Sequence, residues 1–499
     1  MQDFFADCRA ASGHGGRSLR GGLVSVIARA LSAVVQVVAV IALARLLTPE
    51  DYGLVAMVTA VTGFAPMLVD FGTRDALAQR DQITEGEVSA LFWISVAVGG
   101  CLAILVAASG PLLAAFYREP RLNAIAMLSS LTVVNAAVVC QHHGLLRRAM
   151  MFRQLSVIEI GASAAGAATA IAMASQGFGY WALVTRPIVA SGIALVATWL
   201  FCRWIPKRPT FTDGVMEMLR FGIHLTGFSV TDFVSRFSDS VVIGKLFGAE
   251  RLGYYRKALL IYDNNLDLTV ALHNVASVSL SKLRSEPTEL RRVWEKGLST
   301  LCFYAMPIFG ALAVTSKDMV VLVLGARWTT AGILLGVIAL RGIPHVVERT
   351  LGWLHVAAGR SDRWLRWGLF AAVLQLLALL AGVPFGPIGV AWAYVTLTYV
   401  MFIPTITYAG KPLEIGPKDV IRVVWMPLVG TLIAVGVALS MRSTVLSSFS
   451  RPERLLLEAG IFVGTYLLVV PGAMGVRAPL IVIYDLLPGR RAVSSSGAS

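Results

Sequence analysis

Charged residues are scarce in this chain. They make up 14% of the 499 residues, whereas soluble globular proteins carry about 25%. Hydrophobic residues make up 56% of the chain. A chain with so few charges cannot cover a water-facing surface with polar groups, so a soluble enzyme, a disordered chain and a nucleic-acid-binding protein are all excluded. The composition indicates an integral membrane protein.

Cysteine is also scarce, and its spacing carries no chemistry. The five cysteines are Cys8, Cys101, Cys140, Cys202 and Cys302. No two of them form a CxxC pair, and most fall inside apolar runs. Neither a disulfide framework nor a metal site is therefore supported, and we expect no metal and no cofactor. These cysteines are predicted to be small apolar packing residues.

The chain is basic, with a formal net charge of +14. In a membrane protein that crosses the bilayer many times, such an excess is expected from loops on the cytoplasmic side, which are rich in Lys and Arg. The charge therefore does not imply a nucleic-acid partner.

Apolar runs dominate the rest of the sequence. A membrane-spanning helix needs about 20 mostly apolar residues. The sequence predicts about fourteen such spans, near residues 22–44, 52–71, 88–109, 122–143, 155–175, 179–201, 217–243, 253–280, 297–323, 330–357, 363–383, 386–408, 420–440 and 456–476. Basic segments at 142–154, 201–211, 281–297 and 359–366 then fall on one side of the membrane, together with the C-terminal tail. This bias predicts that both termini are cytoplasmic.

An internal repeat is visible in the sequence. The segment RLLTPEDYGL at residues 45–54 and the segment KLFGAERLGY at residues 245–254 share basic, Leu, Glu and Gly positions at a constant offset of 200 residues. Each segment follows the first span of a block of six. The sequence therefore predicts two six-helix blocks, 22–201 and 217–408, as parallel repeats.

The predicted fold is an all-α polytopic membrane protein. Two six-helix bundles related by pseudo-twofold symmetry are expected to surround a central cavity, with two further helices at the C-terminus. The predicted domains are a cytoplasmic segment at 1–21, an N-terminal bundle at 22–201, a cytoplasmic linker at 202–216, a C-terminal bundle at 217–408, two extra helices at 409–480 and a cytoplasmic tail at 481–499.

Ionisable residues inside predicted spans point to function. Such residues are costly in lipid, so they normally face a partner or a water-filled cavity. Three spans carry them with helical spacing. The candidates for binding a substrate are Arg29 and Gln36 in the first span, Asp232, Arg236 and Asp239 in the seventh, and Arg341, His345, Glu348 and Arg349 in the tenth. We interpret them as the lining of a cavity that holds an anionic group such as a pyrophosphate, because Arg forks bind such groups through charge-assisted hydrogen bonds.

A purely structural interpretation of these charges stays open. Asp232 and Arg236 lie four residues apart and can neutralise each other, and Arg341 and Glu348 can do so across two turns.

Three carboxylates are candidates for coupling transport to a proton or a sodium ion. Asp263 and Asp267 lie one turn apart in the eighth span, and two like charges in an apolar site favour protonation of one of them. Glu159 lies in the fifth span. The alternatives are helix capping or solvation for the two aspartates, and an ion pair with Arg186 for Glu159.

Four segments together resemble one protein family. They are ALARLLTPEDYGLVAMV at 42–58, GKLFGAERLGYYRKA at 244–258, VSLSKLRSEPTELRRVWEKG at 278–297 and VLVLGARWTTAG at 321–332. They resemble the Wzx-type bacterial polysaccharide flippases, in the polysaccharide transporter branch of the multidrug/oligosaccharidyl-lipid/polysaccharide exporter superfamily, and in particular the subgroup that exports colanic-acid-like exopolysaccharide units. The recognisable pattern covers about residues 20–410.

The resemblance implies a function and a location. It implies flipping of undecaprenyl-diphosphate-linked oligosaccharide across the bacterial inner membrane by alternating access, with a polysaccharide polymerase and a chain-length regulator as partners. In related flippases, arginines of the cavity hold the diphosphate, and Arg29 matches that placement. No enzymatic activity is expected, because no bond is made or broken.

Other functions remain open at this point. A drug or metabolite exporter of the same superfamily is the main alternative, although a cationic cavity argues against it. A membrane enzyme that uses a polyprenyl sugar would need a long extracytoplasmic loop, which the sequence lacks. A flippase for the peptidoglycan precursor is a further alternative, and the segment after the first span favours the polysaccharide branch.

Overall fold

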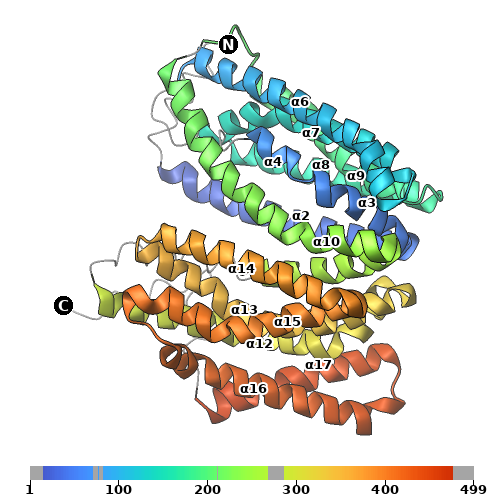
Figure 1. Cartoon of the computed structure of the whole chain (residues 1–499), viewed down its shortest axis with the longest axis vertical. Coiled ribbons are helices and arrows are strands. Elements are labelled where there is room, and N and C mark those ends of the chain that lie inside the picture. The colour runs from blue at the N-terminus through green and yellow to red at the C-terminus, as the bar shows by residue number, and fades with distance from the viewer. Residues whose placement is uncertain (1–14, 71–76, 78–82, 211, 268–285, 476–499) are drawn as a thin grey trace. The chain divides into compact units, whose positions relative to one another are not determined.

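The chain folds into long helices, and neighbouring helices lie side by side within each of its parts (Figure 1). The computed structural model describes residues 15–70, 77, 83–210, 212–267 and 286–475, and all regular structure in these ranges is helical. The helices are α2 (Gly15–Leu46), α3 (Pro49–Thr62), α4 (Ala65–Asp70), α6 (Glu85–Tyr117), α7 (Arg121–Arg148), α8 (Phe152–Ser175), α9 (Trp181–Cys202), α10 (Asp213–Asp267), α12 (Pro287–Leu324), α13 (Thr329–Ala357), α14 (Ser361–Gly382), α15 (Gly386–Gly410), α16 (Pro417–Thr444) and α17 (Arg451–Leu467).

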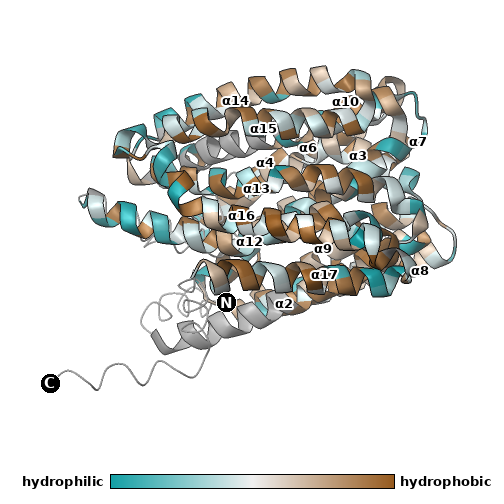
Figure 2. Cartoon of the chain, turned by 90° about the horizontal axis from the view of Figure 1, so that it is seen from below, coloured by the Kyte–Doolittle hydropathy of each residue, from teal (hydrophilic) through white to brown (hydrophobic). Residues whose placement is uncertain are grey.

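The predicted class, an all-α polytopic membrane protein, is confirmed. Within the described ranges, ten helical segments are long and apolar enough to cross a bilayer. One of them, Asp362–Leu413, contains both α14 and α15, which the sequence predicts as two spans. Hydrophobic residues run along the helices, and hydrophilic ones gather toward the helix ends (Figure 2). The predicted total of fourteen spans stays a prediction.

The chain divides into two compact units. Unit 1 is Met1–Gly253 and unit 2 is Tyr254–Ser499. The long helix α10 contributes to both, and its helical geometry is interrupted at Gly248, where φ is 82°. Only glycine adopts such a backbone conformation without strain. The predicted domain boundaries, including the linker at 202–216, stay predictions.

Helix packing follows the small residues in each unit. In unit 1, α6 packs on α7, and α8 packs on α2 and α9; in unit 2, α12 packs on α13 and α16, and α16 packs on α17. A methyl group on Gly342 of α13 would lie 2.2 Å from the ring of Phe309 on α12. A methyl group on Gly430 of α16 would lie 2.2 Å from Val470. Small residues allow such close approach, which is how helices associate in lipid.

Several helices begin with a capping box. At α3 and α6, a threonine side chain accepts from the third residue of the helix, whose carboxylate accepts from the threonine amide; the pairs are Thr48 with Asp51 and Thr84 with Glu87. Pro49 adds a fixed φ at the first position of α3. These capping boxes satisfy the first amides of each helix, and they fix where each chain segment enters its helix.

The two repeated segments contact each other through their glycines, within unit 1. A methyl group on Gly53 would lie 1.7 Å from the carbonyl oxygen of Ala249, and one on Gly253 would lie 1.8 Å from the carbonyl oxygen of Pro49. These positions correspond at the same offset of 200 residues, so the contact is reciprocal. Backbone packs directly on backbone here, which a side chain at either position would prevent.

We expect Gly53→Ala to destabilise the protein by about 1–3 kcal/mol, because overfilling a closely packed contact displaces backbone. The measurement is thermal unfolding of the purified protein in detergent. Gly100→Ala on α6 is the control, because a methyl group there would meet nothing within 4 Å. The control should unfold at an unchanged or higher temperature. Equal unfolding temperatures for Gly53→Ala and the wild type would contradict the contact.

Candidate functional site

A cavity of about 700 Å³ lies within unit 1, among α2, α7, α8 and α9. Cavities that bind small ligands commonly measure about 300–1,000 Å³. Its polar lining consists of Gln36, His143, Arg147, Ser156, Glu159, Ser163, Arg186 and Ser191. Three of these helices, α7, α8 and α9, are long and apolar enough to span a membrane, so polar residues gather here among apolar helices.

Local sequence places the cationic residues of this cavity. His143 and Arg147 lie four residues apart on α7, so they share one helical face. Arg186 precedes Pro187, whose ring removes a backbone hydrogen bond inside α9. Gly166 on α8 sits against this point, since a methyl group there would lie 2.6 Å from the carbonyl oxygen of Arg186. The glycine therefore allows α8 and α9 to approach closely beside the cavity.

Basic residues outnumber acidic ones in the lining of this cavity. Two arginines, Arg147 and Arg186, and one carboxylate, Glu159, line it. Arg186 and Glu159 both line the cavity, but they form no ion pair with each other in the described part of the chain. The alternative interpretation of Glu159 as the ion-pair partner of Arg186 is therefore wrong. Two guanidinium groups in one cavity can bind an anionic group through charge-assisted hydrogen bonds.

A second polar cluster lies within unit 2, on α13. Arg341, His345 and Glu348 follow one another at steps of four and three along this helix. The hydroxyl of Tyr262 on α10 and Nδ1 of His345 share a hydrogen bond of 2.8 Å, and their rings stack 6.2 Å apart. The neighbouring Arg349 donates from Nη1 to the carbonyl oxygen of Leu266 at 3.4 Å.

The centre of this cluster is cationic and buried. The guanidinium carbon of Arg341 lies 5.7 Å from the ring centroid of Tyr394, which is cation–π geometry. The Nε atom of Arg341 is buried and has no hydrogen-bond partner among the described residues. The charges of Glu348 and Arg341 interact, as expected for charges two turns apart on one helix. The cluster is thus held by its own aromatic and charged neighbours.

The other predicted site residues are placed separately. On α10, Arg236 is exposed, whereas Asp239 is buried and accepts a hydrogen bond of 3.0 Å from Ser240. Asp263 is half-buried beside Tyr262. The side chains of Arg29, Asp232 and Asp267 lie outside the described residues. The predicted gathering of all the basic candidates around one pocket therefore stays a prediction.

Sequence reasoning missed several members of both clusters. The segment 142–154 is interpreted only as a basic cytoplasmic segment. In the structure α7 continues through Arg148, and His143 and Arg147 line the cavity. The signal was present, since their spacing of four residues is helical. Tyr262 and Tyr394 lie far from His345 and Arg341 in the sequence, and no local pattern indicates either contact.

Solved structures with a similar fold are membrane transporters. The lipid II flippase MurJ, in its inward closed conformation, matches with a TM-score of 0.71 and 15% identity, over 93% of this chain and 99% of that one. An inward-facing multidrug resistance MATE family transporter of the MOP superfamily matches with a TM-score of 0.53 and 15% identity, over 78% of this chain and 98% of that one. The chain therefore shares the polytopic helical fold of these two membrane proteins.

Sequence comparison places the chain more narrowly. The model of the polysaccharide biosynthesis protein family matches residues 42–332, more than half of the chain, so the chain belongs to that family. It is 26% identical to the teichuronic acid biosynthesis protein TuaB of Bacillus subtilis, over 74% of this chain and 77% of that protein. It is 24% identical to the lipopolysaccharide biosynthesis protein WzxC of Escherichia coli, over 82% and 85%. The succinoglycan biosynthesis transport protein ExoT of Rhizobium meliloti is 25% identical over 68% and 69%.

We expect Tyr262→Phe to destabilise unit 2 by about 1 kcal/mol, because the buried hydrogen bond to His345 is lost. Thermal unfolding of the purified protein measures this. A double-mutant cycle with His345→Ala isolates the pair: the tyrosine substitution should have a clearly smaller effect when the histidine is absent. Equal effects in both backgrounds would show that the hydroxyl stabilises the protein by some other contact.

Proposed function

We propose that this protein is a flippase that moves an oligosaccharide linked to a polyprenyl diphosphate across the bacterial inner membrane, for exopolysaccharide or lipopolysaccharide biosynthesis. The observation that carries the proposal is the cavity of unit 1, where Arg147 and Arg186 outnumber the single carboxylate Glu159. A diphosphate is a compact dianionic group that arginine forks bind well. An apolar span offers such a group no other favourable site.

Different lining residues suit the diphosphate and the sugar of such a headgroup. The guanidinium groups of Arg147 and Arg186 suit the diphosphate oxygens, which accept paired hydrogen bonds. Gln36, Ser163 and Ser191 carry neutral donors and acceptors that suit sugar hydroxyls. The polyprenyl tail stays in lipid throughout. Because no bond is made or broken, the mechanism needs no nucleophile and no acid–base pair, only a cavity whose access alternates between the two membrane faces.

The comparisons with known proteins also support this proposal. Family membership rests on residues 42–332, and the relatives TuaB, WzxC and ExoT are named for teichuronic acid, lipopolysaccharide and succinoglycan biosynthesis. ExoT is named as a transport protein. A transporter rather than a catalyst fits both this naming and the fold. We further propose that both termini lie in the cytoplasm and that a polysaccharide polymerase and a chain-length regulator are partners of the protein.

Cation coupling is part of the proposal. Glu159 lies on the same cavity as the arginines, so binding a proton or a sodium ion there would change the charge that the headgroup meets. Asp263 and Asp267 are the further candidates. Uptake of a lipid-linked sugar into inverted vesicles under an imposed pH gradient or sodium gradient distinguishes the two ions, and transport that responds to neither gradient would contradict coupling.

A drug or metabolite exporter is the second candidate, because the MATE transporter shares the fold. A cavity suited to organic cations would need excess negative charge or aromatic walls. The two arginines of the unit 1 cavity therefore favour the anionic substrate.

Deletion of the gene tests the function directly. We expect a complete lipid-linked repeat unit to accumulate on the cytoplasmic side of the inner membrane, because assembly continues while transfer stops. Mass spectrometry of extracted polyprenyl-linked lipids measures the product. Accumulation of an incomplete repeat unit would instead indicate an enzyme of assembly and would overturn the proposal.

Arg186→Ala should reduce polysaccharide export at least about tenfold, since a hydrogen bond to a charged group contributes about 1.5–3 kcal/mol. Arg186→Lys should recover export only partly, because lysine keeps the charge but lacks the planar fork. The control is Arg292→Ala, whose side chain is 82% exposed. Quantified surface polysaccharide, normalised to membrane-inserted protein, is the measurement. Full export by Arg186→Ala would remove this residue from the site.

A further inference from the structure

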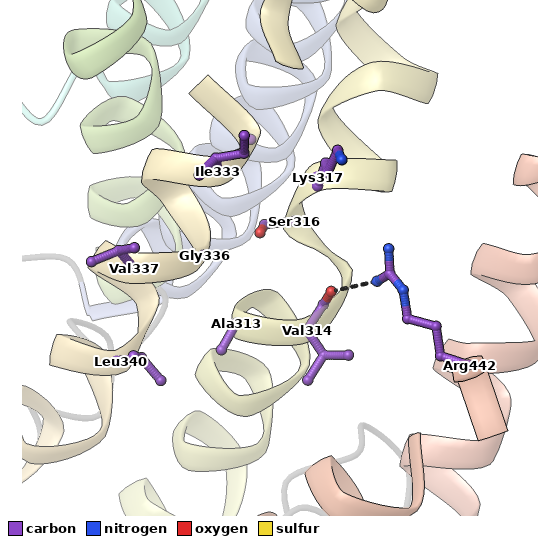
Figure 3. A pocket seen from close by; sticks show the side chains of 10 residues that line it. Ala313, Val314, Ser316, Lys317, Ile333, Gly336, Val337, Leu340 and Arg442 are labelled. Atoms are coloured by element: carbon purple, nitrogen blue, oxygen red, sulfur yellow. Dashed lines mark hydrogen bonds between the residues drawn. The ribbon is translucent and has the colours of Figure 1, made fainter. Parts of the chain in front are cut away.

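A second cavity, of about 360 Å³, lies within unit 2 among α12, α13 and α16 (Figure 3). One side is aliphatic and is formed by Ile333, Val337 and Leu340 of α13. The other side carries two cations, Lys317 of α12 and Arg442 of α16. The cavity is thus amphipathic, with apolar and cationic walls that face each other.

Two glycines of α13 pack closely against α12 beside this cavity. A methyl group on Gly332 would lie 2.8 Å from the Cα atom of Lys317, and one on Gly336 would lie 2.9 Å from the hydroxyl of Ser316. These two glycines lie one turn apart on α13 and bring that helix close to α12. Both glycines and Ser316 line the cavity.

The cations lie near the helix ends. Lys317 is seven residues before the end of α12 at Leu324, which is about 10 Å along the helix. Arg442 is two residues before the end of α16 at Thr444. This depth in a membrane-spanning bundle is where lipid headgroups meet their acyl chains, and basic side chains near helix ends commonly reach that level.

Arg442 is fixed in place by an ion network behind the cavity. Its Nη2 atom donates to Oδ2 of Asp318 at 2.8 Å, and its Nη1 atom donates to the carbonyl oxygen of Val314 at 3.0 Å. Arg454 on α17 donates to the other oxygen of Asp318 at 3.0 Å. Both oxygens of Asp318 therefore accept hydrogen bonds from arginines. Asp318 does not neutralise the charge of Lys317.

The remaining charges leave the site cationic. Glu458 is completely buried and lies 3.5 Å from Nη1 of Arg442. The two carboxylates thus face three basic side chains. Lys317 is exposed and forms no hydrogen bond or ion pair with any residue in the described ranges. A free ammonium beside a fixed guanidinium, with aliphatic side chains opposite, suits an anion that carries an apolar group.

We propose that this cavity binds an anionic phospholipid of the bilayer. The headgroup phosphate lies between Lys317 and Arg442, and the start of an acyl chain follows Ile333, Val337 and Leu340. A soluble anion would use the two cations but gain nothing from the aliphatic wall, where Ile333 is 42% exposed. With the predicted topology, the lipid belongs to the outer leaflet. The site is separate from the cavity of unit 1 and does not depend on the proposed transport function.

Native mass spectrometry of the purified full-length protein in detergent tests the proposal. The probes are phosphatidylglycerol, zwitterionic phosphatidylcholine and undecaprenyl diphosphate, each titrated alone. We expect phosphatidylglycerol to bind more tightly than phosphatidylcholine. Lys317→Gln should weaken phosphatidylglycerol binding about fivefold, equivalent to about 1 kcal/mol for one basic side chain near an anionic lipid, and should leave phosphatidylcholine binding unchanged.

Lys411→Gln is the matched control, because Lys411 is exposed in unit 2 and lies outside this cavity. It removes the same charge and should leave phosphatidylglycerol binding unchanged. Equal phosphatidylglycerol affinity for Lys317→Gln and the wild type would overturn the site. Tighter, Lys317-dependent binding of undecaprenyl diphosphate would overturn the phospholipid assignment and give the cavity to the sugar carrier.

Discussion

The cost of placing a charge inside an apolar helix bundle governs this structure. An ionisable side chain at the centre of a span costs about 2.5–3.5 kcal/mol by insertion measurements, so each one needs water or a partner. Three solutions appear. Arg186 lines a cavity, Arg341 lies against the ring of Tyr394, and Arg442 donates to Asp318. The first of these leaves the positive charge available to a ligand, and the second places it against an aromatic ring. The third holds the guanidinium in place while it still lines the cavity of unit 2.

This difference separates sites that bind from clusters that stabilise. The cavity of unit 1 has more arginines than carboxylates and has the volume for a headgroup. The cluster on α13 has comparable charges, but Tyr262 and Tyr394 cover them, and the charge of Glu348 interacts with that of Arg341. Both patterns look alike in the sequence, since each is a set of charges at helical spacing. Only packing determines which of them can accept an anion from outside.

Much of the fold could be predicted from the sequence, because runs of about 20 apolar residues are a strong signal that does not depend on distant contacts. Most predicted spans fall within helices where the structure describes them, although the span predicted at 52–71 is divided between α3 and α4. The site was harder, because tertiary packing brings its residues together. Gln36 and Glu159 were site candidates, and both line one cavity. His143 and Arg147 were interpreted only as part of a basic cytoplasmic segment, since basic residues at a span end also mark topology. The hydrogen bond between Tyr262 and His345 joins residues 83 positions apart, beyond the reach of any local pattern.

The reciprocal contact of Gly53 and Gly253 has a consequence for how this sequence can diverge. If the two halves arose by duplication, most positions are free to drift apart, because each copy meets different neighbours. Gly53 and Gly253 are not free to change, because Gly53 makes room for the carbonyl group of Ala249 and Gly253 makes room for that of Pro49. A change at one copy cannot be compensated by a smaller residue at the other, because none exists. The pair should therefore persist as a fixed landmark long after the surrounding repeat has become unrecognisable.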